Sequence, residues 1–310
     1  MRTAWPRART LIAASPYRRR FRQGATLTPR RFFLVEAAAS GRLQSRREAP
    51  RVKGRIGNLD KHPWTTVAPP EGPVEREFVR PVALGESVAP YRIIKLATGV
   101  VPMEDGEVLT STTAEAHGDR GLGAWLRDAE TKWNELSNKN ADGTPRLSLS
   151  QSLDHLRKLT AQATRVPIRI LYTKSGTRLS ACWIEDEDVI VDQQAIWSGA
   201  NSLEEAAYVA AILNTEIVLD RVKDLQPVGQ RDPRHFDNLV WTLPIPEFDA
   251  DEALHSDIAA AALRAADVAL GVEWPEGAHF TTKRGLIRQA LVAEGVAETI
   301  ERLVDALLPL

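Results

Sequence analysis

The residues best suited to chemistry lie in one short segment, 229–235, which combines two arginines and a histidine with a glycine and a proline. Glycine and proline favour turns, so we expect an exposed loop that points Arg231, Arg234 and His235 outward. A guanidinium can bind O6 and N7 of guanine bidentately, or it can bind a phosphate. The segment is therefore a candidate loop for reading nucleic acid. The alternative is that Arg234 and His235 cap a helix or pair with neighbouring aspartates.

Two further groups of side chains have chemistry that suits DNA. Gln193 and Gln194 are adjacent amides, and an amide can bind adenine bidentately where it faces a groove. Near the N-terminus, arginines surround Phe21, a pattern that favours phosphate contacts. The candidate cations are Arg18, Arg19, Arg20, Arg22, Arg30 and Arg31. A solvated, partly disordered arm would explain the same composition.

The element that must position the loop at 229–235 is a helix on its N-terminal side. Ser202, with Glu205 three residues later, predicts a capping box. Apolar residues then recur at helical spacing as far as Leu219, and the helix should end near Pro227. After the loop, residues 239–243 alternate like a short strand, and the prolines in 244–246 predict an extended exit.

The remaining pattern predicts a mixed α+β fold built from small strands, with a helical C-terminal part. We expect a strand from Arg31, a linker or exposed hairpin over 37–61, and a connection at 192–197. Further strands are expected at 77–82, 91–96, 168–172, 178–184 and 188–191. Helices are expected at 121–139, 148–164, 251–271, 283–294 and 296–307. We divide the chain into a basic N-terminal segment and linker (1–62), a recognition-like domain (63–250) and a C-terminal helical segment (251–310).

Composition narrows the class of protein. Residues 1–60 hold 15 Lys and Arg against 3 Asp and Glu, whereas the whole chain has a net charge of −1. The basic part therefore suits an anionic partner. With a single cysteine, Cys182, the chain can form no internal disulfide, which favours a cytoplasmic location. Cys182 itself is predicted to be a buried strand residue. We expect no membrane span, because the apolar runs are too short.

Two motifs resemble one family. The segment 24–36, GATLTPRRFFLVE, is similar to one found between the catalytic and recognition parts of SAM-dependent adenine-N6 DNA methyltransferases, including single-chain restriction–modification enzymes. The runs 205–215, 234–236 and 243–246 resemble the C-terminal target-recognition region of the same enzymes. The motifs occur in the family's order. In such enzymes a segment like 172–176 precedes the recognition helix, so the resemblance makes Lys174, Ser175 and Thr177 candidate DNA contacts.

The chain lacks the family's catalytic motifs. There is no glycine-rich SAM loop and no Asn-Pro-Pro-Tyr-type tetrapeptide, since the only Pro-Pro pair, Pro69–Pro70, follows Ala68 and precedes Glu71. The loop at 138–143 lacks the ligand positions of a calcium loop, so no metal site is predicted.

The resemblance implies the target-recognition part of such a methyltransferase, which binds double-stranded DNA without catalysis of its own. The chain would be either truncated or encoded separately from a catalytic subunit, and SAM is expected only with a catalytic domain. The alternative is a protein-interaction or remnant module that has no DNA affinity.

Overall fold

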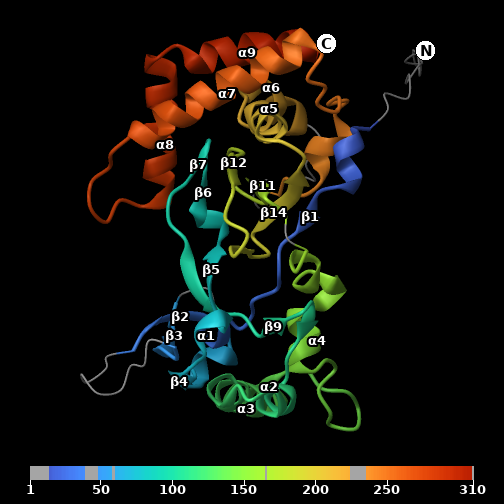
Figure 1. The fold of residues 1–310 in the computed structure, drawn as a ribbon, viewed down its shortest axis with the longest axis vertical. Coiled ribbons are helices and arrows are strands. Elements are labelled where there is room, and N and C mark those ends of the chain that lie inside the picture. The colour runs from blue at the N-terminus through green and yellow to red at the C-terminus, as the bar shows by residue number, and fades with distance from the viewer. Residues whose placement is uncertain (1–13, 39–47, 58–59, 165, 224–234, 309–310) are drawn as a thin grey trace, which may run out of the picture.

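The computed structural model describes residues 14–38, 48–57, 60–164, 166–223 and 235–308. Two sheets follow one another along the long axis of the molecule, and helices cover the outer end of each (Figure 1). The fold class predicted from the sequence, α+β with a helical C-terminal part, is confirmed.

The smaller sheet has four strands, each antiparallel to its neighbour. Their order is β1 (Arg22–Gln23), β14 (Ala195–Ala200), β11 (Ile168–Thr173) and β12 (Ala181–Ile184). Helix α5 (Leu203–Leu213) packs on β11 and β12 and is buried along its whole length apart from its first turn. The largest hydrophobic core lies between this sheet and the C-terminal helices.

The larger sheet has six strands, in which only the pair of β13 and β5 is parallel. Their order is β13 (Ile190–Val191), β5 (Val79–Ala83), β8 (Ala97–Val100), β2 (Leu34–Ala37), β3 (Arg51–Gly54) and β4 (Glu71–Pro73). Two small ribbons are formed by β6 (Val88–Ala89) with β7 (Arg92–Ile93) and by β9 (Met103–Glu104) with β10 (Glu107–Val108).

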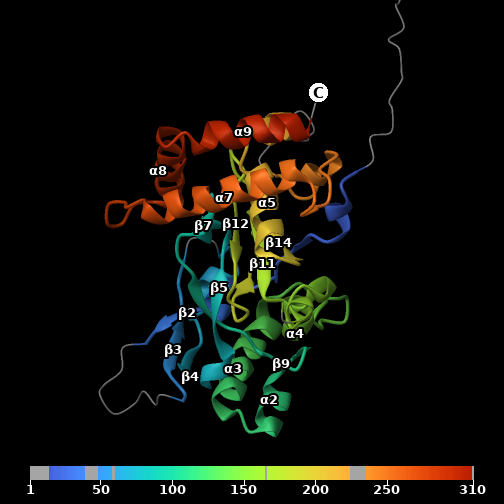
Figure 2. The same ribbon diagram turned by 45° about the horizontal axis from the view of Figure 1, so that its top comes forward.

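Helices cover both ends of the molecule. Beside the larger sheet lie α1 (Arg30–Phe33), α2 (Ser111–His117), α3 (Arg120–Leu136) and α4 (Leu149–Leu153). At the other end, α5 is followed by α6 (Glu216–Lys223), α7 (Ala253–Gly271), α8 (Phe280–Ala293) and α9 (Val296–Leu307). Figure 2 shows α7 lying across α5, with α9 beyond it. Among the described residues, no helix has the length and apolar character needed to cross a membrane.

The segment 188–194 joins the two sheets. The chain leaves β12 of the smaller sheet, pairs as β13 with β5 of the larger one, and returns as β14. A core of its own fills this junction and includes Leu171, Cys182, Val191 and Trp197. Cys182 is buried in β12, as predicted, and burial raises the pKa of its thiol to about 12. The thiol is therefore a packing group.

The helix predicted to begin at Ser202 and to end near Pro227 is instead two helices, α5 and α6, separated at Asn214 and Thr215. The structure describes α6 as far as Lys223, and Pro227 lies outside the described residues. The side chain of Asn214 binds the edge strand β12: its Nδ2 donates to the carbonyl of Ala181 and its Oδ1 accepts from the N–H of Ala181, both at 2.9 Å. Unpaired backbone groups on an edge strand need partners. The break in the helix therefore places Asn214 where its side chain can bind the backbone of β12.

Two other helical or strand predictions were wrong. The helix predicted over 148–164 ends at Leu153, because the Asp154 carboxylate accepts from the backbone N–H of Leu159 and Thr160 at 3.1 and 2.9 Å and holds a series of turns. The strand predicted over 239–243 is a 3-10 helix, Leu239–Thr242. Its adjacent residues Val240 and Trp241 are both fully buried, which opposite faces of an exposed strand would not allow.

The N-terminal predictions also need correction. The strand expected from Arg31 begins at Leu34, after the helical turn α1, whose first N–H groups donate to the carboxylate of Asp60. Residues 192–197 are more than a connection, since β14 starts at Ala195. The hairpin expected within 37–61 exists as β2 and β3, but it pairs on both sides inside the larger sheet. The division of the chain at residues 62 and 250 stays a prediction.

Candidate nucleic-acid interface

Four segments that carry polar and cationic residues meet between the two sheets, through both side-chain and backbone hydrogen bonds. Lys158 Nζ donates to Gln23 Oε1 at 2.8 Å, and Gln23 Nε2 donates to the carbonyl of Gln193 at 2.7 Å. The backbone N–H of Lys174 donates to the carbonyl of Gln194 at 3.1 Å. We call this region the basic surface; it consists of Arg22, Gln23, Arg157, Lys158, Lys174, Gln193 and Gln194.

Charge on the basic surface is imperfectly compensated. Burial, and then the charge of Lys174, lower the pKa of the Lys158 ammonium. The Arg22 guanidinium is exposed and lies 5.5 Å from the ring centre of Trp197. Lys174 Nζ lies 3.5 Å from the carboxylate of Asp237. The repulsion between the two lysines therefore adds to the cost of burying the Lys158 charge.

The bend that presents Gln193 and Gln194 is fixed by close backbone contacts. The N–H of Ala25 donates to the carbonyl of Val191 at 2.7 Å, and the N–H of Gln193 donates to the carbonyl of Ala25 at 2.8 Å. A Cβ atom at Gly24 would lie 2.3 Å from the Val191 oxygen, so only glycine allows this approach. Gly24, the first residue of the motif at 24–36, therefore allows the chain after β1 to lie in close contact with the bend at 191–194.

Arg30 and Arg31 are internal structural residues. The Arg30 guanidinium binds Asp192 at 2.8 Å, and Arg31 binds Asp60 at 3.1 Å, with all four side chains at most 9% exposed. Burial raises the pKa of Asp192, and the charge of Arg30 opposes this shift. These two arginines cannot reach a DNA duplex in this conformation, so we leave them out of the proposed interface.

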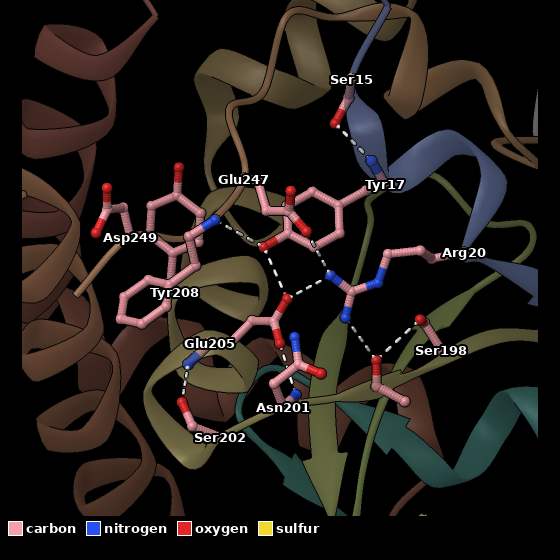
Figure 3. Close-up of polar contacts among 12 residues, drawn as sticks. Ser15, Tyr17, Arg20, Ser198, Asn201, Ser202, Glu205, Tyr208, Glu247 and Asp249 are labelled. Atoms are coloured by element: carbon pink, nitrogen blue, oxygen red, sulfur yellow. Dashed lines mark hydrogen bonds and ion pairs between the residues drawn. The ribbon is translucent and has the colours of Figure 1, made fainter.

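Arg20 is half-buried and is held by hydrogen bonds and ion pairs within the protein (Figure 3). Its guanidinium donates to Glu205 Oε1 at 2.6 Å, to Glu247 Oε1 at 3.2 Å and to the carbonyl of Gly199 at 3.0 Å. Tyr17 Oη donates to the same Glu205 oxygen at 3.1 Å and accepts from the N–H of Phe248 at 3.1 Å.

Glu205 thereby departs from the predicted capping box. Ser202 Oγ accepts from the N–H of Glu205, as expected, but the Glu205 carboxylate accepts from the N–H of Asn201 at 2.6 Å instead of returning a bond to Ser202. Its other oxygen holds Arg20 and Tyr17. The neighbours of Arg20 in sequence, Arg18 and Arg19, are exposed.

The hairpin at 174–177 lies beside His235, and their role as DNA contacts stays a prediction. Ser175 and His235 form an antiparallel bridge, and the N–H of Phe236 donates to the carbonyl of Lys174 at 2.8 Å. Ser175, Thr177 and His235 are exposed. Arg231 and Arg234 lie outside the described residues.

A hollow lies between this hairpin and α8. It has a volume of ≈ 940 Å³, and its walls include Thr177, Arg284 and Arg288. Burial, followed by the charge of a neighbouring arginine, lowers the pKa of both Arg284 and Arg288 to about 10. Both guanidiniums donate to backbone carbonyls, Arg284 to Val88 and Gly85 and Arg288 to Leu179.

Sequence reasoning missed Arg157 and Lys158, because it placed both in the interior of a helix over 148–164. The available signal was Asp154, whose carboxylate can accept backbone N–H groups and so compete with a helix, followed by the cations at 157 and 158. The described residues also contain a group with metal-ligating atoms within 4.8 Å of one another, Glu104, His117 and Asp119. It lies outside the basic surface, and His117 and Glu104 already bind each other at 2.8 Å.

Known proteins resemble this chain in fold but not in sequence. The sequence matches no family model and no curated protein. The solved structure of the type IIL restriction-modification enzyme MmeI in complex with DNA is similar, with a TM-score of 0.51 and 12% identity. The chain shares a fold with part of this enzyme. The match covers 75% of this chain and 28% of MmeI. The type IIG restriction endonuclease BpuSI gives a TM-score of 0.37 at 14% identity, over 76% of this chain and 27% of BpuSI.

The contacts of Arg20 predict a role in stability. Replacing Arg20 by Ala should reduce the free energy of unfolding by about 3 kcal/mol, because it leaves the buried Glu205 carboxylate without its cation. Arg19→Ala, an exposed substitution in the same turn, should change it by less than about 0.5 kcal/mol. Urea denaturation measures both. If Arg20→Ala kept full stability but lost DNA affinity, Arg20 would be the DNA contact that the sequence suggested.

Proposed function

We propose that this chain is the DNA-binding, target-recognition part of an adenine-N6 DNA methyltransferase of the restriction–modification type. The observation that carries the proposal is the grouping of Arg22, Arg157, Lys158 and Lys174 near two half-buried glutamines, Gln193 and Gln194, of which Gln193 donates its amide to Thr28 Oγ1 at 3.2 Å. Cations suit the phosphates of a duplex, and amides suit the edges of its bases. The similarity of fold to part of MmeI, an enzyme whose structure was determined with DNA, supports a double-stranded DNA partner.

Two groups of contacts divide the work in this proposal. The cations of the basic surface bind phosphates and set the position of the duplex. Phosphate contacts are the same for every base sequence, so they contribute no sequence discrimination. Base reading falls to Gln193, Gln194 and the hairpin at 174–177 with His235. The bridge between Ser175 and His235 supports this grouping, because it keeps the hairpin and the end of the 229–235 loop in register.

Catalysis would require a second component. The sequence lacks the SAM loop and the Pro-Pro tetrapeptide, so we propose that a methyltransferase catalytic domain or separately encoded subunit supplies SAM binding and base flipping. In the proposed division, residues 63–250 form the recognition domain and 251–310 support it.

We also propose a cytoplasmic location, consistent with the unpaired thiol of Cys182.

The cations of the basic surface should govern the salt dependence of DNA binding. Arg22→Ala, Arg157→Ala and Lys158→Ala should each reduce the slope of log affinity against log salt by about 0.9, because each removes one phosphate contact. Fluorescence anisotropy of a labelled random duplex over a range of salt concentrations measures the slope. Arg264→Ala, on the exposed side of α7, is the matched control and should keep it.

Deleting the basic N-terminal residues 1–23 would also remove cations, but it would remove Tyr17 and Phe21 from the hydrophobic core as well. A loss of DNA binding could then result from unfolding, so the deletion does not isolate the effect of charge. The single substitutions avoid that problem. If the wild-type chain binds no duplex at any salt concentration, the proposal is wrong and a protein-interaction or remnant module remains.

The glutamines should affect sequence preference instead of overall affinity. Gln194→Ala should relax the preference at one base position, with a loss of about 1–3 kcal/mol of discrimination, because a bidentate amide contact to adenine is removed. Lys158→Ala should weaken all sequences alike. Selection from a randomised duplex library, followed by sequencing of the bound fraction, compares the two variants. A uniform loss with Gln194→Ala would assign that residue to phosphate contact or to structure.

The purified chain should bind no SAM on its own, since it lacks the residues that hold the methionine part of the cofactor. Isothermal titration with SAM tests this directly. Saturable binding in the micromolar range would contradict the assignment to a recognition part without a catalytic domain, whether or not the chain binds DNA.

A further inference from the structure

A turn after α4 exposes a leucine in an unfavourable backbone conformation. Leu156 is 75% exposed, and it has a φ of 59°, followed by Arg157 with a φ of 57°. Residues with a side chain rarely adopt positive φ, because the Cβ atom crowds the backbone oxygen, and leucine gains no compensating local hydrogen bond there. Two such residues in succession require support from their surroundings.

The surroundings do hold this turn in place. The N–H of Arg157 donates to the carbonyl of Asp154 at 2.7 Å. The Asp154 carboxylate accepts from the N–H and Oγ1 of Thr160 at 2.9 Å. On the far side of the turn, the ammonium of Lys158 is fixed to Gln23 of β1 at 2.8 Å. The side chain of Leu156 is therefore presented to solvent by a conformation that the fold imposes.

The leucine stands among cations. It borders a hollow of ≈ 550 Å³ that is also lined by Arg22, Arg157 and Lys158, and the exposed His155 precedes it in sequence. A single apolar side chain within a cationic rim does not resemble the apolar centre of a protein–protein interface. It does match duplex DNA, which has a negatively charged exterior and an apolar stack of bases within.

We propose that Leu156 is a wedge that inserts between base pairs of the bound duplex. Apolar side chains inserted at a base step unstack it and kink the helix. The cations around the hollow would hold the flanking phosphates while the leucine enters the stack. The inference rests on the proposed function, because it requires the basic surface to bind duplex DNA, and it adds that binding deforms the duplex.

The test compares two substitutions of Leu156 with one at a leucine elsewhere. Leu156→Asn removes the apolar wedge but suits the backbone, because asparagine tolerates positive φ. Leu156→Met keeps an apolar side chain. Leu270→Asn is the control, since Leu270 is 63% exposed in α7. Each protein is bound to closed-circular plasmid DNA that is then relaxed by a topoisomerase, and the linking number of the products reports unwinding without requiring a known recognition sequence.

We expect the wild type, Leu156→Met and Leu270→Asn to shift the topoisomer distribution, and Leu156→Asn to lose the shift at equal occupancy. Occupancy is measured separately by anisotropy with a labelled duplex, and thermal unfolding should give the same midpoint for all four proteins. A shift with Leu156→Asn equal to that of the wild type would overturn the wedge, and so would a loss of thermal stability in that variant. Binding by the wild type without any shift would overturn the wedge but leave the proposed function intact. Absence of duplex binding would overturn both.

Discussion

The ion pair between Arg30 and Asp192 connects the two halves of this protein. Asp192 lies between β13, which belongs to the larger sheet, and β14, which belongs to the smaller one. One of its oxygens binds the Arg30 guanidinium and also accepts the N–H of Gln194. A buried charge requires a partner with good geometry, so the positions of α1, of the junction and of the bend at 193–194 are coupled. The basic surface takes its shape from that coupling.

A second buried carboxylate attaches the N-terminal segment. Glu205, at the start of α5, holds Arg20 and Tyr17, and Ser15 Oγ donates to the carbonyl of Ile245 at 2.7 Å. Phe21 stacks on Trp241 with ring centres 4.3 Å apart, so the same segment also enters the largest core. These contacts fix β1, which carries Arg22 and Gln23, relative to β14. The position of the basic surface thus depends on residues that are not part of it.

The sequence predicted the elements whose patterns are local and missed those decided by a distant partner. Helix α3 and the pair β11 and β12 follow from periodicity, and their predicted ranges were close to those observed. Asn214 was read as one more helical residue, since nothing in its neighbourhood reveals that its amide binds Ala181 of an edge strand. In the candidate site, the resemblance gave the hairpin and His235 as separate candidates, and the bridge between Ser175 and His235 is a contact that the sequence did not predict. Lys158 was missed, because its place on the surface depends on Gln23, far away in sequence.

The charge asymmetry of the chain illustrates why composition alone misplaces a binding surface. The excess of cations in residues 1–60 suggested a basic arm, yet five of its described cations are paired with acids inside the fold, and only Arg31 takes its partner, Asp60, from the same segment. The cations of this segment found in ion pairs are Arg20, Arg30, Arg31, Arg51 and Lys53. Arg22 alone among the described arginines of that segment joins the basic surface, where its companions are Arg157, Lys158 and Lys174 from the acidic remainder of the chain. What an anion encounters is the charge left uncompensated after folding, and that quantity is set by which carboxylates the tertiary structure brings to each cation.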